Sequence, residues 1–585
     1  MTVQDTIQTI FASSIKENNH RESDYFHAIR QLIDLKSRGS TPEETAAIDR
    51  AMETVYDLLR DELLTNSGKP VSPVKFGTSG WRGMLGKDIF VRSVAFVTAA
   101  ILQLYRDADQ DPELRQALGV SGFAEMCRRG CVVGFDNRFG GPLLALAAMN
   151  VLAESGVRIL YAGEATTGIL SASVLVRKAA FSINLTPSHN PLEYGGFKYN
   201  AADAGPAAAI LTERITRLAR QIIDRGESAF VPPGLDLQRP LEEIRDVEQE
   251  DALASWQQLV RDNRHRHGID YDRVMAELAS RDDIVVGVDA VHGASRTYIS
   301  RLLKDPPPER LFVLRDQADV TFGGIAPEPS STNMQPVMTA LAARPEPFRV
   351  GAIIDPDGDR IRFTDGDTEI SMNQFGAMAY HFLHEIKGKK GMVAKTVATS
   401  NLANSVAGAL GEEVFEPRVG FKEFKPVIGK ALVYFEESDG ISVIGHTPEK
   451  DAFIGLLLAL DMTMSLGRSL ADYLQKIESA YGPFYPARDG VAVSQQGEEL
   501  KKTLARLEKY GEGVEVEIGG SRKKIARVIT IDGRKMIFED GSWIMIRPSG
   551  TEPKVRFYVE ARDRGETRLL VDKAREMLAE IGLLS

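Results

Sequence analysis

Short apolar runs that end in polar loops recur through the middle of this chain. Five of them are rich in Val, Ile, Phe and Ala and pass directly into Gly, Asp, Ser or His, at residues 131–138, 179–191, 283–293, 349–360 and 431–440. Stretches with helical periodicity separate these runs. The alternation is typical of βα units and of parallel or mixed sheets. Because ligands of open α/β sheets bind beyond the carboxyl ends of the strands, we expect loops from several sheets to face one cleft.

The two ends of the chain have different patterns. Residues 1–70 are polar, with apolar positions such as Tyr25, Ile29 and Leu32 at helical spacing, which predicts an amphipathic pair of helices. Residues 65–74 have the composition of a linker. The last hundred or so residues mix strands and helices, and residues 534–550 predict a hairpin that ends in a turn.

The length of 585 residues is too great for one core and indicates about four domains. Breaks in composition near 225–245, 304–309 and 481–490 suggest boundaries. We predict a helical extension at 1–70, three α/β domains with mixed sheets at 71–265, 266–370 and 371–485, and an α+β domain at 486–585. These domains would surround a central cleft.

The charge of the chain limits its partners. A net charge of -11 argues against binding to nucleic acid or to a membrane surface, but it allows a small anionic substrate held by a local cluster of Arg and Lys. No apolar run reaches the roughly 18 residues of a membrane span. The N-terminus lacks the features of a signal peptide, so we expect a cytoplasmic location. Two cysteines exclude a disulfide framework.

The run at 349–360 ends in Asp355-Pro-Asp357-Gly-Asp359-Arg360. Three carboxylates at alternate positions can converge on one hard cation, and magnesium prefers such oxygen ligands while leaving room for a phosphate oxygen. Arg360 can pair with the same phosphate or hold the loop. An EF-hand needs a Glu at the twelfth loop position, where this chain has Gly366, and a solvated acidic turn rarely follows a buried strand. We therefore predict a magnesium site.

The run at 179–191 ends in Thr-Pro-Ser188-His189-Asn-Pro. A Ser hydroxyl in a turn after a strand can act as a nucleophile or as a phosphoryl carrier, and the adjacent His189 can donate a hydrogen bond or a proton. The alternative is a turn or helix-capping serine, as most such clusters are. Lys198 follows closely and can shuttle a proton, unless it is a plain surface lysine. No G-x-S-x-G elbow supports a serine hydrolase.

Two further loops carry groups that suit a sugar phosphate. Glu436-Glu437-Ser438 offers carboxylates and a hydroxyl to the vicinal hydroxyls of a sugar. Residues 547–554 combine the guanidinium of Arg547 with hydroxyls and backbone N–H groups around Gly550, which would make a nest for a phosphate dianion. On its own a Glu-Glu-Ser turn is weak evidence, and the alternative for residues 547–554 is a β-turn with a neighbouring surface arginine.

Together these loops resemble the α-D-phosphohexomutase family, which includes the phosphoglucomutases and phosphomannomutases. The resemblance extends over about residues 71 to 565. It includes five motifs in order: KFGTSGWRG at 75–83, TPSHNP at 186–191, DPDGDR at 355–360, EES at 436–438 and RPSGTEP at 547–553. The resemblance implies a four-domain, heart-shaped enzyme with a central cleft.

The resemblance also implies roles for individual residues. Asp355, Asp357 and Asp359 would bind one magnesium ion together with a phosphorylated Ser188. Residues around the transferred phosphoryl group would be Arg82, His189 and Lys198. Glu436 and Ser438 would bind the sugar hydroxyls, and further substrate contacts would come from Arg360, Lys422, His446 and Lys450. The phosphate that does not react would be held by Arg547, Ser549, Gly550 and Thr551.

In the family's reaction, the phosphoserine gives its phosphoryl group to a sugar monophosphate. The resulting bisphosphate turns around and returns the other phosphoryl group to the serine, so a sugar bisphosphate acts as activator. The partners implied are a small sugar phosphate, with no nucleic acid or membrane, in a monomer or homodimer.

The substrate and the class of enzyme have alternatives. Glu-Glu-Ser resembles glucose-type members, which favours glucose phosphates with mannose phosphates second. Phe435-Glu436-Glu437 also resembles the pentose-phosphate branch. The chain has Phe435, Asp439 and Ala452 where many members have Gly, and Arg418 near a position where Thr is common. An aspartyl-type sugar phosphatase that uses Asp355 is the rival enzyme. A non-catalytic sugar-phosphate binder is disfavoured because the serine and all three aspartates are present.

Overall fold

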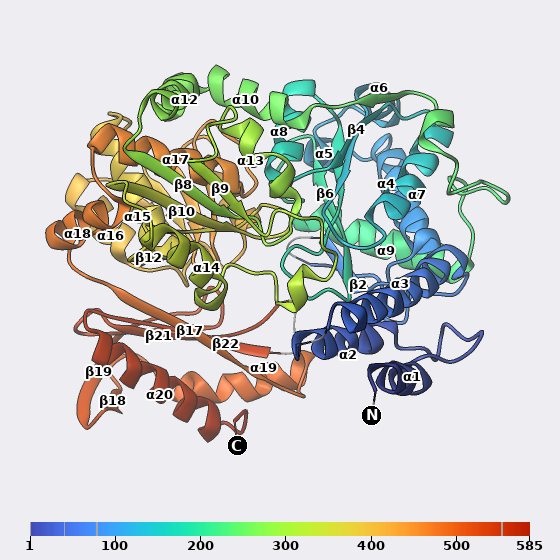
Figure 1. The fold of residues 1–585 in the computed structure, drawn as a ribbon. Helices are drawn as coiled ribbons and strands as arrows, with labels where there is room; N and C mark the ends of the chain where they lie inside the picture. The colour runs from blue at the N-terminus through green and yellow to red at the C-terminus, as the bar shows by residue number, and fades with distance from the viewer. Residues whose placement is uncertain (1, 40, 78–79, 551–553, 585) are drawn as a thin grey trace.

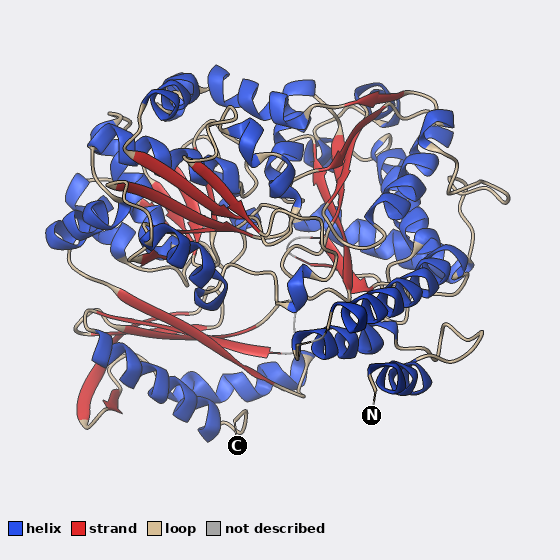
Figure 2. Ribbon diagram, in the orientation of Figure 1, coloured by secondary structure: helices blue, strands red, loops and turns tan. Residues whose placement is uncertain are grey.

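Four separate β-sheets follow one another along the chain (Figures 1 and 2). The computed structural model describes residues 2–39, 41–77, 80–550 and 554–584. Three of the sheets are mixed and the last is antiparallel, with helices packed against them. This arrangement confirms the predicted fold class of three α/β domains and one α+β domain.

The N-terminal segment contains three helices rather than the predicted pair: α1 (Val3–Ser14), α2 (Tyr25–Ser37) and α3 (Pro42–Thr65). Helix α1, with 12 residues, is almost as long as α2, with 13, but it was not among the expected helices. Its start is nevertheless encoded by a capping box in which Thr2 and Asp5 exchange side-chain and backbone hydrogen bonds. Residues 66–75, which follow α3, form no regular element, in agreement with the predicted linker.

The first sheet has the strand order β1-β2-β6-β5-β3-β4-β7. Its strands are β1 (Phe76–Gly77), β2 (Gly80–Met84), β3 (Cys131–Phe135), β4 (Ile159–Glu164), β5 (Phe181–Leu185), β6 (Tyr194–Ala201) and β7 (Val247–Gln249). Its helices are α4 (Val91–Ala108), α5 (Pro112–Leu118), α6 (Phe123–Arg129), α7 (Gly141–Glu154), α8 (Thr167–Arg177), α9 (Ala209–Arg225) and α10 (Ala252–Asp262). Strand β7 pairs with β4, so the expected break at 225–245 is a connection within this sheet.

The second sheet has the order β12-β11-β10-β8-β9. Its strands are β8 (Ile284–Asp289), β9 (Leu311–Leu314), β10 (Phe348–Ile354), β11 (Ile361–Thr364) and β12 (Glu369–Ile370). Helices α11 (Arg264–His267), α12 (Tyr271–Ser280), α13 (Ile299–Leu302) and α14 (Ser331–Ala342) accompany it. The expected break at 304–309 is wrong, because β8 and β9 on its two sides pair in parallel within one sheet.

The third sheet has the order β14-β13-β15-β16. Its strands are β13 (Val393–Lys395), β14 (Val414–Phe415), β15 (Val433–Glu436) and β16 (Gly440–Val443). Its helices are α15 (Met372–His381), α16 (Leu402–Leu410), α17 (Ala452–Leu466) and α18 (Leu470–Tyr481). No single helix among the described residues is long and apolar enough to cross a membrane. Only α17 and α18 meet that length and composition together, and they are bent by 79° at their junction.

The fourth sheet has the order β17-β22-β21-β20-β19-β18 and is antiparallel throughout. Its strands are β17 (Tyr485–Ala492), β18 (Glu515–Ile518), β19 (Ser521–Ile529), β20 (Arg534–Phe538), β21 (Trp543–Pro548) and β22 (Lys554–Ala561), with helices α19 (Gly497–Ala505) and α20 (Arg564–Glu580). Strands β20 and β21 form the predicted hairpin. Three residues separate the end of α18 from the start of the sheet, within the expected break at 481–490.

Candidate active site

Three of the chemical loops occupy the same position in their sheets. In each of the first three sheets, a buried strand runs into the loop and an antiparallel strand returns from it: β5 to β6, β10 to β11 and β15 to β16. The loops therefore connect hairpins rather than the βα units that the alternating pattern suggested. A hairpin fixes both ends of a short loop in one ladder, so each chemical loop is held at the edge of a sheet.

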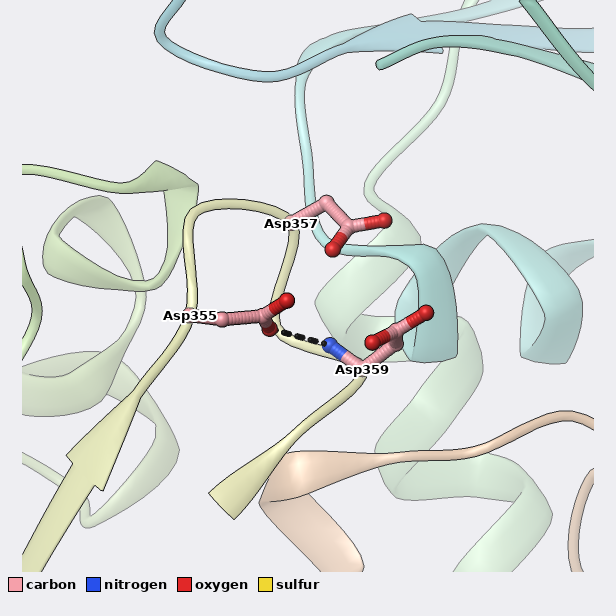
Figure 3. Close-up of side chains that lie close together, drawn as sticks. All are labelled: Asp355, Asp357 and Asp359. Atoms are coloured by element: carbon pink, nitrogen blue, oxygen red, sulfur yellow. Dashed lines mark hydrogen bonds between the residues drawn. The ribbon is translucent and has the colours of Figure 1, made fainter. Parts of the chain in front are cut away.

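The metal loop brings its three carboxylates together. Oxygen atoms of Asp355, Asp357 and Asp359 lie within 4.8 Å of one another, and all three residues are buried (Figure 3). The backbone N–H groups of Asp359 and Arg360 donate to Asp355 Oδ1, each at 3.0 Å. Gly358 has a φ of 64°, and a Cβ there would lie 2.7 Å from Thr166, so this tight turn requires glycine.

The donor set fits a magnesium ion. Asp357 Oδ1 and Asp359 Oδ1 are buried and accept no hydrogen bond from any residue that the structure describes. Arg360 Nε is 3.7 Å from Asp359 Oδ1, but buried carboxylate oxygens that accept no hydrogen bond are costly, and a hard cation suits them. Lys198 Nζ lies 2.8 Å from Asp359 Oδ2, and Lys450 Nζ lies 3.1 Å from the same atom. Two ammonium groups thus offset part of the acidic charge from outside.

Ser188 lies directly against the acidic cluster. Its Oγ donates to Asp355 Oδ2 at 2.8 Å, and the residue is fully buried. Its φ of 59° places it in the left-handed region, which is uncommon for a residue other than glycine. Thr186 Oγ1 accepts from Ser188 N at 2.9 Å, and His189 Nδ1 lies 3.4 Å from Ser188 Oγ. The loop therefore presents the serine in a strained and well-determined conformation.

A cavity of about 120 Å³ opens beside these groups. Residues from all three predicted loops and from domain four line it, among them Arg82, His189, Arg360, Glu436, Ser438, Lys450, Arg547, Ser549 and Gly550. Arg82 Nη1 donates to Asn190 Oδ1 at 2.8 Å. Arg82 is therefore oriented by the serine loop, residues 186–193 between β5 and β6. Arg547 pairs with Asp532 at 2.9 Å. Cations from separate domains thus surround one small space.

Burial and neighbouring charges set the protonation of the site. Burial, with Arg360 and Arg82 nearby, holds the pKa of His189 well below its usual value, so its imidazole is neutral at pH 7. Burial alone would lower the pKa of Lys198, but Asp357 and Asp359 outweigh it and raise the pKa, so the amine stays charged. Burial raises the pKa of Glu436 to about 7.

Two predicted substrate residues do not line the cavity. His446 is buried, with Nε2 2.6 Å from Asp451 Oδ2 and its ring packed edge-on to Trp256. Lys422 lies at the start of a 3₁₀ helix at Phe421–Val427 and does not line the cavity, although the preceding residues Val419, Gly420 and Phe421 do. Thr551 lies outside the described residues.

The sequence reasoning missed four residues. Arg556 and Tyr558 of β22 line the cavity, and their two-residue spacing on a strand that follows the phosphate loop was the available signal. Asp136 and Arg138 follow β3 in another strand-end loop. Arg138 donates to the carbonyl oxygens of Ser188 and Pro191, each at 2.6 Å, and so holds the backbone of the serine loop.

Four domain models of the phosphoglucomutase/phosphomannomutase family match consecutive parts of the chain. Alpha/beta/alpha domains I, II and III match residues 73–225, 265–368 and 371–481, and the C-terminal domain matches residues 494–577. The chain therefore belongs to the phosphoglucomutase/phosphomannomutase family. It is an enzyme of the mutase class, as its named relatives are.

Relatives of known name match nearly the whole chain. A phosphoglucomutase from Komagataeibacter xylinus is 25% identical over 559 residues, which cover 89% of this chain and 92% of the relative. A phosphoglucomutase/phosphomannomutase from Thermococcus kodakarensis is 26% identical over 522 residues, covering 87% and 97%. The crystal structure of a family protein from Burkholderia thailandensis shares the fold, with a TM-score of 0.65 and 19% identity over 87% of this chain and 98% of that one.

Proposed function

We propose that this protein interconverts hexose 1-phosphates and hexose 6-phosphates, with glucose phosphates favoured and mannose phosphates second. One observation carries the proposal. The hydroxyl of Ser188 lies 2.8 Å from the carboxylate of Asp355 in a buried three-carboxylate cluster, and the next residue, His189, lines a cavity that arginines also line. A hydroxyl between a cation site and an anion-binding cavity suits a phosphoryl carrier.

In the proposed reaction, Ser188 carries a phosphoryl group at the start of the cycle. The bond between Oγ and phosphorus breaks as a hydroxyl of the sugar monophosphate forms its own bond to phosphorus, which gives a sugar bisphosphate. The neutral imidazole of His189 accepts the proton of that hydroxyl, and the Ser188 oxygen leaves with the electron pair of the broken bond and takes up the proton that His189 releases. The bisphosphate turns around and returns its other phosphoryl group to Ser188, and added bisphosphate primes the enzyme in the same way.

Charge compensation is the main requirement of this chemistry. A magnesium ion held by Asp355, Asp357 and Asp359 together with the phosphoserine would withdraw negative charge from the transferred group. Arg82 and Arg360 line the cavity beside it and add positive charge. Their guanidinium groups can bind phosphate oxygens in pairs, which also orients the phosphoryl group.

The other wall of the cavity would hold the sugar and its second phosphate. Glu436 and Ser438 are placed to accept and donate hydrogen bonds to sugar hydroxyls, and Arg547 with the turn at Ser549 and Gly550 would bind the phosphate that does not react. Because that anchor comes from a different domain, either end of the sugar can be held there while the opposite end reacts.

An aspartyl phosphatase is less well supported. Asp355 would have to attack phosphorus, but Oδ1 already accepts two backbone N–H groups and Oδ2 accepts the Ser188 hydroxyl. These bonds withdraw electron density from both oxygens and leave the serine as the better carrier.

A coupled assay of glucose 1-phosphate conversion, with glucose 1,6-bisphosphate and magnesium, tests the proposal. We expect turnover that a chelator abolishes and magnesium restores, and a loss of at least about a thousandfold in Ser188→Ala because the phosphoryl carrier is removed. Intact mass should show one phosphate on the wild type and none on Ser188→Ala. Ser228→Ala, in a surface turn of the same domain, serves as control.

Rates on mannose, glucosamine and ribose 1-phosphates complete the assay. A preference for ribose 1-phosphate would overturn the hexose assignment. A phosphate that is labile to hydroxylamine and survives in Ser188→Ala would overturn the serine mechanism.

A further inference from the structure

The N-terminal helices lie outside the matched family domains, the first of which begins at residue 73. They are nevertheless part of the core of the first domain. Ile29 and Leu32 of α2 and Val55 and Leu59 of α3 are fully or almost fully buried in the same apolar cluster as the first sheet. Figure 1 shows α2 and α3 running along the lower edge of that domain. The extension is therefore fixed in place rather than appended.

Helix α2 contacts the serine loop directly. Arg30 Nη2 donates to Glu193 Oε1 at 2.8 Å and to Oε2 at 2.5 Å. Glu193 lies between the TPSHNP motif and strand β6, and its carbonyl oxygen accepts from Leu85 N of the first domain at 2.9 Å. The C-terminal end of the serine loop is thus tied to α2 by an ion pair that joins segments 163 residues apart.

The same helix also contacts the second domain. Gly324 closes a short 3₁₀ turn at Phe322–Gly324, and a Cβ on it would lie 2.7 Å from Ile33 Cγ2. Phe322 of this turn is fully buried in the cluster of the first domain, and its ring lies 4.9 Å from the guanidinium of Arg138. Arg138 in turn donates to the carbonyl oxygen of Ser188. Helix α2 therefore packs against the turn at Phe322–Gly324. Phe322 of this turn packs against Arg138, which binds the carbonyl oxygen of Ser188.

Helix α3 contacts the two residues that follow Arg138. Tyr56 packs on Phe139 with ring centroids 4.7 Å apart, and a Cβ on Gly140 would lie 2.8 Å from Leu63. Phe139 and Gly140 directly follow Arg138. Both long helices of the extension thus contact the segments that hold Arg138 in place.

We propose that the N-terminal extension positions the phosphoryl carrier, with Arg30 as its positioning residue through Glu193. Ser188 occupies a left-handed conformation that is uncommon for a residue other than glycine, and such conformations persist only where the surroundings over-determine them. The ion pair at one end of the loop and the packed turn beneath it supply that constraint. The effect on catalysis rests on the proposed function, whereas the effect on the loop's order does not.

Two measurements on Arg30→Glu test the proposal. Amide hydrogen exchange of residues 186–194 should rise, because like charges then face each other across the loop end. With glucose 1-phosphate, kcat should fall about fivefold at unchanged KM, as a disturbed carrier slows transfer without touching the sugar. Arg30→Glu/Glu193→Arg should restore both. Lys36, like Arg30, is on α2, and Lys36→Glu, which breaks its 2.6 Å pair with Asp49 of α3, should change neither.

Unchanged exchange in Arg30→Glu, or equal effects in Lys36→Glu, would overturn the proposal whether or not the wild type turns over glucose 1-phosphate. Failure of the charge swap to restore the protection of residues 186–194 would do the same. Arg30→Gln removes the pair without reversing its charge and should give smaller changes in the same direction. A wild type with an ordered loop that turns over no sugar phosphate would instead contradict the proposed function.

Discussion

Glu436 is a buried carboxyl group that ends β15 and lines the cavity, and its charge is poorly solvated. Burial raises its pKa to about 7, while Lys450 opposes the shift. A carboxyl group whose pKa is higher in the folded than in the unfolded state destabilises the fold as the pH rises from about 4.5 through 7. Ionised Glu436 could accept hydrogen bonds from two sugar hydroxyls, but its ionisation lowers the free energy of unfolding.

We expect Glu436→Gln to stabilise the protein more at pH 8 than at pH 5, by about 2 kcal/mol, because the amide carries no charge to bury. It should also lower kcat/KM for glucose 1-phosphate at least about tenfold, since a charged acceptor becomes a neutral one. Denaturant titrations at both pH values and the coupled assay measure the two effects. Glu499→Gln, at an exposed position of α19, provides the control. A pH-independent difference in stability would contradict the argument.

At the scale of elements, one arginine binds three carbonyl oxygens of the serine loop. Arg138 is buried beside Asp136, whose pKa burial raises to about 6, and it donates to carbonyl oxygens of Ser188, Asn190 and Pro191. A planar guanidinium can serve several carbonyls at once, which an ammonium group cannot do with the same geometry. The loop's conformation should therefore be sensitive to a substitution that keeps the charge.

We expect Arg138→Lys to lower kcat at least about tenfold and to cost about 2 kcal/mol in the free energy of unfolding. Arg129→Lys is a matched control in the same domain, because Arg129 also donates to backbone carbonyls, those of Lys178 and Gly119 at 2.8 Å each, but away from the cavity. It should lose similar stability and keep its kcat. Equal losses of kcat in both variants would show that Arg138 acts only through global stability.

The elements themselves were largely predictable from the sequence, and their contacts were not. The five apolar runs all became strands because such runs are buried wherever they lie. Their hairpin returns were missed because β6, β11 and β16 follow loops too rich in polar residues to suggest immediate pairing. The family resemblance implied a substrate contact for His446, which does not line the cavity. The carboxylate of Asp451 and the indole of Trp256 bind it instead, and Trp256 is distant in sequence.

Two of the departures from the family pattern, at Asp439 and Phe435, are explained by contacts that the sequence alone did not reveal. Asp439 has a φ of 70°, the conformation that favours glycine, and its carboxylate pairs with Arg362 at 2.7 Å. Phe435 fits because its partner in α15 is Gly376, where a Cβ would lie 2.2 Å from the phenyl ring. Both substitutions are thus compensated by residues far away in the chain.

At the scale of the whole molecule, length and composition indicated the number of domains, but the surfaces between domains could not be read from them. The junction of the third and fourth domains contains a buried lysine, Lys535 of β20. Its Nζ donates to the carbonyl oxygen of Val397 at 2.8 Å and lies 4.0 Å from the Trp543 ring. Lys395 lies close by and pairs with Glu416. Nothing in the apolar pattern of 534–550 distinguishes this lysine from an exposed one.

Burial, and then the charge of Lys395, lowers the pKa of Lys535 to about 7, although Glu416 and Glu560 oppose the shift. A lysine whose pKa is lower in the folded state destabilises the fold fully below that pKa, and the penalty is relieved as the pH rises toward about 10.5. We therefore expect Lys535→Met to stabilise the protein at pH 7 and to lose about 2 kcal/mol of that advantage at pH 9. Denaturant titrations of variant and wild type at the two pH values measure the change, with the exposed Lys501→Met as control. An advantage that does not shrink with pH would mean that the amine is already charged and well paired in the folded protein, and the junction between the two domains would then be held by an ion pair rather than by a neutral amine over an indole ring.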